Sequence, residues 1–195
     1  MATKSKALKR TLVLVGLMGA GKSSIGRRLA IRLGAEFVDT DIEIEQAARS
    51  SIEDIFTLHG EKAFRDGERR VIERLLKKPP HVLATGGGAF MCEETRETIR
   101  SCGFSIWLRA DIEVLLRRVQ RRNDRPLLKG NDPEEVLERL IAERYPVYAK
   151  ADLIVDTTEA PHLTVVNEIL ECIRSLPDAE ALLGKGLFTN ARVIA

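Results

Sequence analysis

The sequence predicts an α/β fold of three layers, with helices on both faces of a five-stranded parallel sheet. Short apolar, β-branched runs recur along the 195 residues, and longer segments with helical spacing of apolar residues lie between them. A glycine-rich stretch, GLMGAGKSS from Gly16 to Ser24, joins the first run to the first helical segment. The expected strands are Thr11–Val15, Glu36–Asp39, His81–Thr85, Phe104–Leu108 and Leu153–Val155.

The first helix is expected to begin inside the glycine-rich loop and to end at Gly34. Its apolar stripe consists of Ile25, Leu29, Ala30 and Leu33. A second helix is expected to begin near Asp41, and a third runs from Glu61 to Leu76 before Pro79 and Pro80 stop it.

The sequence RRNDRPLLKGNDP, residues 121–133, is polar and contains glycine and proline, which predicts a loop that acts as a mobile lid. Helical spacing resumes over residues 133–149. We expect one domain over residues 1–195, with a flexible basic tail at residues 1–10. Residues 177–195 carry mixed signals that favour neither packing nor a free tail.

The composition argues against several classes of protein. Hydrophobic residues make up 44% of the chain and charged residues 31%, as in a soluble domain that needs no disulfides. A net charge of +2 is too small to indicate a partner such as nucleic acid or a membrane surface. No apolar run approaches a membrane span and no secretory signal is evident, so we expect a cytoplasmic protein. The three cysteines are odd in number and lack C-x-x-C spacing, so we expect reduced thiols. A single domain with a buried active site favours a monomer.

Gly16, Gly21, Lys22 and Ser23 satisfy the pattern G-x-x-x-x-G-K-[ST] between a strand and a helix. The glycines let backbone N–H groups turn toward phosphate oxygens, and the helix N-terminus adds the positive end of its dipole. Lys22 supplies a positive charge and Ser23 a hydroxyl for Mg²⁺. The alternative, a tight turn beside an exposed lysine, does not explain the complete pattern. The loop therefore predicts a site for the phosphates of ATP or GTP.

Asp39 and Asp41 stand at the end of the second expected strand, in the tripeptide DTD. Residues two apart in an extended segment face the same side, so both carboxylates should project at the carboxyl edge of the sheet, where open α/β folds bind ligands. One would hold Mg²⁺ through its water shell, and the other would accept a hydrogen bond from an alcohol. The alternative is capping of a helix that begins near Ile42, which suits Asp41 best.

Three glycines, Gly86 to Gly88, follow the third expected strand and would let the backbone come close to a ligand, although a simple turn is the alternative. Arg65, Arg125 and Arg144 each lie beside a helix kink, a proline or the lid. Arginine suits bidentate binding of a carboxylate or phosphate, but on composition alone each arginine is more often a surface residue.

Together the segments GLMGAGKSS, DTD, FRDGE, ATGGGAF, RPLL and ERYPVYAKAD, in this order, resemble the shikimate kinase family, a branch of the P-loop folds similar to nucleoside monophosphate kinases. The resemblance runs from about Val13 to Asp156. It implies a P-loop kinase fold and ATP-dependent phosphorylation of the 3-hydroxyl of shikimate. The product would be shikimate 3-phosphate, in the biosynthesis of chorismate and the aromatic amino acids.

On the nucleotide side, the resemblance implies that the ATP phosphates are wrapped by Gly19, Ala20, Gly21, Lys22, Ser23 and Ser24. Ser23 would bind Mg²⁺, and Asp39 would support the ion through its water shell. Arg125 on the lid would close over the phosphates and act in catalysis with Lys22. Arg118 would lie near the adenine.

On the acceptor side, the resemblance implies that Asp41 binds the shikimate hydroxyls and accepts the proton in catalysis. Arg65 and Arg144 would hold the carboxylate. The backbone of Gly86, Gly87 and Gly88 would complete the substrate site, with Gly87 at its centre.

Three positions depart from the pattern of this family. Ser24 stands where threonine is common, Val147 replaces leucine before Tyr148, and DTTEAPHL after the last strand offers no evident polar contact for adenine. The nearest alternative is a gluconate-kinase-like enzyme, which shares the phosphate loop, whereas a nucleotide monophosphate kinase would need acceptor contacts that we do not find. A GTPase-type switch, from a different class, should carry N-K-x-D and D-x-x-G motifs, and the sequence contains neither.

Overall fold

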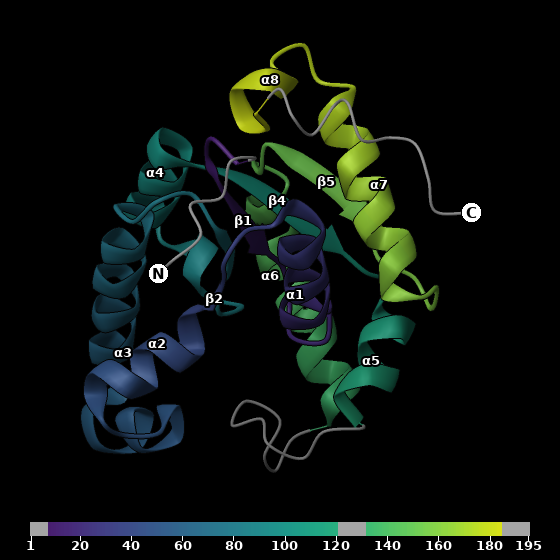
Figure 1. Ribbon diagram of the computed structural model, residues 1–195. Helices are drawn as coiled ribbons and strands as arrows, with labels where there is room; N and C mark the ends of the chain where they lie inside the picture. The colour runs from purple at the N-terminus through teal and green to yellow at the C-terminus, as the bar shows by residue number, and fades with distance from the viewer. Residues whose placement is uncertain (1–7, 121–131, 185–195) are drawn as a thin grey trace.

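The computed structural model describes residues 8–120 and 132–184, so Arg125 and nearly all of the expected lid lie outside the described residues. The strands are β1 (Thr11–Val15), β2 (Phe37–Asp39), β3 (Val82–Ala84), β4 (Gly103–Arg109) and β5 (Leu153–Asp156). They form one sheet in the order β2-β3-β1-β4-β5, and each neighbouring pair is parallel (Figure 1). The predicted five-stranded parallel sheet is therefore confirmed, with each strand boundary within one residue of its expected place.

Helices lie on both faces of the sheet, which gives the predicted three layers. The described helices are α1 (Lys22–Leu33), α2 (Thr40–Ala48), α3 (Ile52–Leu76), the short 3₁₀ helix η1 (Ala89–Met91), α4 (Glu93–Cys102), α5 (Ile112–Gln120), α6 (Pro133–Tyr148), α7 (His162–Arg174) and α8 (Ala179–Leu182). Helices α1 and α7 pack together on one side of the sheet, and α3 packs with α4 on the other (Figure 1).

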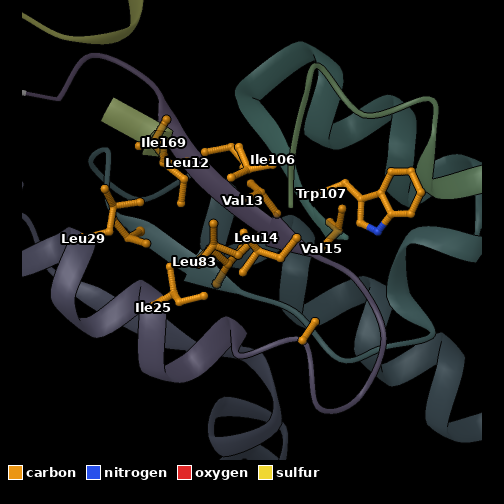
Figure 2. Close-up of a cluster of buried hydrophobic side chains, with 14 of the residues drawn as sticks. Leu12, Val13, Leu14, Val15, Ile25, Leu29, Leu83, Ile106, Trp107 and Ile169 are labelled. Carbon is orange, nitrogen blue, oxygen red and sulfur yellow. The ribbon is translucent and has the colours of Figure 1, made fainter. Parts of the chain in front are cut away.

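The centre of the core is β1, whose five residues are all buried. Figure 2 shows Leu12 and Leu14 among the side chains of Ile25 and Leu29 from α1. Burying a leucine or isoleucine side chain stabilises a fold by roughly 1.5–3 kcal/mol, so this contact fixes α1 firmly against the sheet. It thereby fixes the loop that connects β1 to α1.

Helix α3 is longer than the sequence predicts. It begins at Ile52, with Ser51 capping the N–H of Asp54, and it bends at Gly60, whose φ of 77° lies in the left-handed region. The segment after Gly60 carries Arg65 and Glu68 toward the carboxyl edge of the sheet. The helix ends at Leu76, as the two prolines that follow predict.

The two ends of the described chain meet. Leu8, which falls within the expected flexible tail of residues 1–10, instead forms an antiparallel bridge with Leu183, and Lys9 donates its N–H to the carbonyl of Leu182. Leu8 and Leu183 are only 4% and 1% exposed. The expectation of a free tail is therefore wrong for residues 8–10, and residues 177–183 pack onto the fold. Residues 1–7 and 185–195 lie outside the described residues.

The structure also bears on a membrane span, on the cysteines and on the burial of the tryptophan. Within residues 8–120 and 132–184, no helix combines the length and the apolar composition that a bilayer span needs. Cys92, Cys102 and Cys172 are free thiols. Trp107 is a core residue with 3% exposure.

Candidate active site

All five strands point the same way, so their carboxyl ends lie along one edge of the sheet, where the ends of β1, β2 and β3 lie side by side. The phosphate loop, the DTD tripeptide and the glycine tripeptide stand at these three strand ends. The expected functional segments therefore share one edge, although they are far apart in the sequence.

The phosphate loop runs from Gly16 to Gly21, between β1 and α1. Gly16, Gly19 and Gly21 have φ values of 139°, 83° and 93°, which favour glycine. Lys22 Nζ donates hydrogen bonds to the carbonyls of Gly16, at 2.8 Å, and Leu17, at 2.9 Å. The ammonium group is therefore held over its own loop, where an anion would be bound.

Asp39 connects the first turn of α1 to α2. One carboxylate oxygen accepts a hydrogen bond from the hydroxyl of Ser23 at 2.7 Å, and the other accepts the N–H of Asp41 at 3.1 Å. Asp39 is thus the N-cap of α2 and not Asp41, which corrects the sequence-based alternative. Asp41 lies in the first turn of the helix, so the expectation of an extended DTD segment with two parallel carboxylates is also wrong.

The glycine tripeptide is surrounded by the side chains that were expected to bind substrate. A Cβ added at Gly86 would lie 2.5 Å from Glu68 Oε1 and 3.0 Å from Asp41 Oδ1. One added at Gly88 would lie 2.5 Å from the guanidinium atoms of Arg65.

These glycines have no φ in the left-handed region, unlike those of the phosphate loop. At Gly86 and Gly88 the reason for glycine is the close approach of side chains and not the backbone conformation, whereas a Cβ at Gly87 would make only ordinary contacts at 3.6 Å or more. The tripeptide is therefore more than a turn.

Arg65 and Glu68 form an ion pair on α3, with Nη1 2.8 Å from Oε2. Arg65 also binds Glu61 at 3.1 Å on the exposed side. Glu68 is 2% exposed, and its Oε1 has no hydrogen-bond partner among the described residues. Burial raises the pKa of Glu68 above its usual value, and the attraction of Arg65 offsets this only in part.

Arg144 reaches the same tripeptide from α6. Its Nη1 donates to the carbonyl of Gly87 at 3.0 Å, and the side chain is largely buried. Its Nε is buried and has no hydrogen-bond partner within the described part of the chain. The hydroxyl of Tyr148, also on α6, donates to the same carbonyl of Gly87.

Arg118 on α5 contacts the outer side of the phosphate loop. Its Nη1 donates to the carbonyl of Gly19 at 3.1 Å, and its Nη2 donates to the carbonyl of Thr158 in the loop after β5. His162 is close by, since its Nε2 would be 3.7 Å from a Cβ at Gly21. Burial lowers the pKa of His162, as do the charges of Arg28 and Arg118, so the imidazole is neutral near pH 7.

Three residues of the site were not found by sequence reasoning. Glu68 stands in FRDGE, three residues after Arg65, and this helical spacing was a usable signal for the pair. Thr40, fully buried, accepts the N–H of Gly86 at 3.0 Å. Tyr148 carries no local signal, because its partner lies 61 residues away in the sequence.

Comparisons with known proteins agree with this geometry. A sequence profile of the family described as shikimate kinase matches residues 18–174. The shikimate kinase of Paramagnetospirillum magneticum is 57% identical over 177 residues, which cover 90% of this chain and 90% of that protein. The shikimate kinase of Caulobacter vibrioides strain NA1000 is 58% identical over 165 residues, or 85% of this chain and 82% of that protein.

Solved structures give the same result. The shikimate kinase from Acinetobacter baumannii in complex with shikimate matches with a TM-score of 0.82 and 38% identity, over 85% of this chain and 93% of that chain. A gluconokinase from Sinorhizobium meliloti matches with a TM-score of 0.54 and 18% identity, over 83% and 89% of the two chains, which shows the shared fold alone. The family match takes in Lys22 of the phosphate loop, the glycine tripeptide and Arg144, so this chain belongs to the shikimate kinase family.

Proposed function

We propose that this enzyme transfers the γ-phosphate of ATP to the 3-hydroxyl of shikimate at the edge of the sheet around Gly86–Gly88. The observation that carries the proposal is the convergence of Arg65, Arg144 and Asp41 on this tripeptide, beside the phosphate loop. An acid with several hydroxyls needs cations for its carboxylate and acceptors for its hydroxyls, and this set supplies both.

On the phosphate side, the N–H groups of residues 19–24 and the N-terminus of α1 would surround the ATP phosphates. Lys22 would exchange the carbonyls of Gly16 and Leu17 for phosphate oxygens. Its charge would then oppose the negative charge that builds up during phosphoryl transfer, a reaction that depends mostly on positioning and electrostatics.

The Ser23–Asp39 pair fits a magnesium ion. Mg²⁺ keeps several water ligands and takes one or two protein oxygens together with substrate phosphates. It therefore needs no cluster of three acidic or other ligating side chains, and the described residues contain none. Ser23 would bind the ion directly and Asp39 through water, and the bound ion would neutralise phosphate charge.

On the acceptor side, Arg65 and Arg144 would bind the carboxylate from α3 and α6. Asp41 would hold the hydroxyls and accept the proton of the attacking one, for which its carboxylate lies next to Gly86. The buried Glu68 would keep the Arg65 guanidinium over Gly88.

The remaining assignments concern the base and the lid. Arg118 would lie against the adenine, since it already binds both Gly19 and the loop after β5. Arg125 lies outside the described residues, and its proposed role over the phosphates rests on the resemblance of RPLL to the family pattern. We further propose that residues 1–195 act as one kinase domain, as a monomer in the cytoplasm. Size-exclusion chromatography with light scattering, which measures the molar mass in solution, tests whether the protein is a monomer.

The first experiment measures ADP release with Mg²⁺ and ATP in the presence of shikimate, gluconate or no acceptor. Release that depends on shikimate, with phosphate found on the 3-hydroxyl by NMR, is the expected result. Release with gluconate instead would favour the sugar-acid alternative. Stabilisation by GTP and not ATP in a thermal melt would favour a GTPase-like switch.

A further inference from the structure

We propose that Tyr148 is a positioning residue for the acceptor site, and that its hydroxyl holds the Gly87 carbonyl and the Arg144 guanidinium in the arrangement that binds the substrate carboxylate. The inference rests on the proposed function of that site. It assigns a role in substrate binding to a residue at the end of α6 that sequence reasoning passed over.

Tyr148 and Arg144 share one hydrogen-bond acceptor. Both the hydroxyl of Tyr148 and Nη1 of Arg144 donate to the carbonyl oxygen of Gly87. A carbonyl oxygen has two lone pairs, so these two donors use its full capacity. Since a peptide unit is planar, the fixed carbonyl also fixes the N–H of Gly88, which points away from α6.

The aromatic cluster around Tyr148 holds its hydroxyl beside Gly87 and Arg144. The side chain is fully buried, and its ring lies 6.3 Å from that of Phe90 and 5.8 Å from that of Trp107, between ring centroids. Burial raises the pKa of Tyr148 to about 12, so the phenol remains a donor throughout the pH range of the enzyme.

Arg144 is held in part through the same carbonyl. Its Nε is buried without a hydrogen-bond partner within the described residues, so the side chain depends strongly on the contact that Nη1 makes with Gly87. Ordering a long side chain costs rotamer freedom, and substrate binding is spared that cost where the side chain is already held in its binding conformation. Tyr148 reduces this cost because it keeps the acceptor of Arg144 in place.

Tyr145 provides a matched control on the same helix. Its hydroxyl also donates to a backbone carbonyl, that of Ala110, and its ring packs against Trp107 with centroids 4.9 Å apart. Removing either hydroxyl costs one hydrogen bond in the same aromatic cluster, but only Tyr148 reaches the glycine tripeptide. A purely structural role would make the two variants behave alike.

The experiment compares Tyr148→Phe and Tyr145→Phe with the wild-type enzyme in steady-state kinetics and thermal melts. Tyr148→Phe is expected to raise the KM for shikimate about three- to tenfold, the range that loss of one neutral hydrogen bond gives. The KM for ATP and kcat should stay within about twofold, and Tyr145→Phe should leave both KM values within about twofold of wild type.

A double-mutant cycle tests whether Tyr148 acts through Arg144. In an Arg144→Lys background, where the shared contact is already altered, Tyr148→Phe should raise the KM for shikimate by a smaller factor than in wild type. Equal factors in both backgrounds would show that the hydroxyl does not act through Arg144.

The results also separate this inference from the proposed function. An active wild-type enzyme whose Tyr148→Phe variant matches Tyr145→Phe in the KM for shikimate would overturn the positioning role alone. An equal rise in the KM for both substrates would do the same. A folded wild-type enzyme that releases no ADP with shikimate would overturn the proposed function, and this inference with it.

Discussion

Glu68 lies buried against Arg65, with Oε2 2.8 Å from Nη1, while the arginine keeps 28% of its side chain exposed. Glu68 is buried, and the guanidinium of Arg65 extends from it over Gly88 to the surface of the site. A cation held in this way is preorganised for a carboxylate, because the protein has already ordered its side chain.

Arg65→Ala should raise the KM for shikimate by roughly ten- to 150-fold, the range for loss of a hydrogen bond to a charged group, and leave the KM for ATP almost unchanged. Initial rates with each substrate varied in turn measure this. Arg70→Ala, on an exposed position of α3, is the control and should change neither value. Equal damage to both KM values would contradict the assignment of Arg65 to the carboxylate.

Lys22→Met should lower kcat at least about a hundredfold and leave the fold intact, because it would remove the charge that we propose stabilises the transferred phosphate. Single-turnover assays measure the rate, and circular dichroism with a thermal melt reports the fold. Lys150→Met, at an exposed position beyond α6, should keep full activity. Retained turnover in the Lys22 variant would remove the phosphate loop from the mechanism.

Gly88→Ala should raise the KM for shikimate, since its Cβ would lie 2.5 Å from the Arg65 guanidinium and must displace it. Gly67→Ala is the control, because no atom lies within 4 Å of a Cβ there. This helical position should gain roughly 0.5–1 kcal/mol of stability from the change. The two variants therefore separate displacement of Arg65 from the loss of backbone freedom that any glycine-to-alanine change brings. Steady-state kinetics measure the first effect and thermal melts the second.

Glu68→Gln should change how stability depends on pH. Folding raises the pKa of Glu68, so the native state binds more protons than the unfolded state between the two pKa values. Its contribution to the free energy of unfolding is thus fully present below the unfolded pKa and is lost as the pH rises through the folded one. The free energy of unfolding of the wild type minus that of Glu68→Gln should decrease as the pH rises above the ordinary pKa of a glutamate, about 4.3.

Urea titrations across that pH range measure the difference. Glu73→Gln is the control with the opposite sign, because a hydrogen bond from Lys77 lowers the pKa of Glu73. A difference for Glu68→Gln that rises with pH would contradict the burial argument.

Much of the fold and part of the site follow from local patterns. The strand, glycine loop and helix from Thr11 to Leu33 could be predicted because their signals are contiguous: an apolar run, a turn that needs positive φ, and a 3.6-residue stripe. Arg65 and Arg144 could be singled out by their place beside a helix kink or a proline, but their role in binding the carboxylate came only from the resemblance to a family, since the chain has many arginines.

The DTD tripeptide shows where local reasoning failed. The tripeptide was expected to be extended, and this was wrong because Asp39 accepts the N–H of Asp41 as the N-cap of α2. The helix therefore begins at Thr40, directly after the strand. The position of Leu8 was unpredictable for another reason: its partner, Leu183, is at the other end of the described chain.

The sequence by itself determined the class of fold, the phosphate loop and the order of the functional segments, because periodicity and turn chemistry act over a few neighbouring residues. Only the tertiary structure decided that Glu68 is buried, that Asp39 and not Asp41 is the cap, and that Arg144 and Tyr148 meet at Gly87, 57 and 61 residues away in the chain. These contacts depend on strand order and on how α3 and α6 pack around one sheet edge. Contacts between residues so far apart in the sequence produce no local pattern of apolar and polar residues from which they could be predicted.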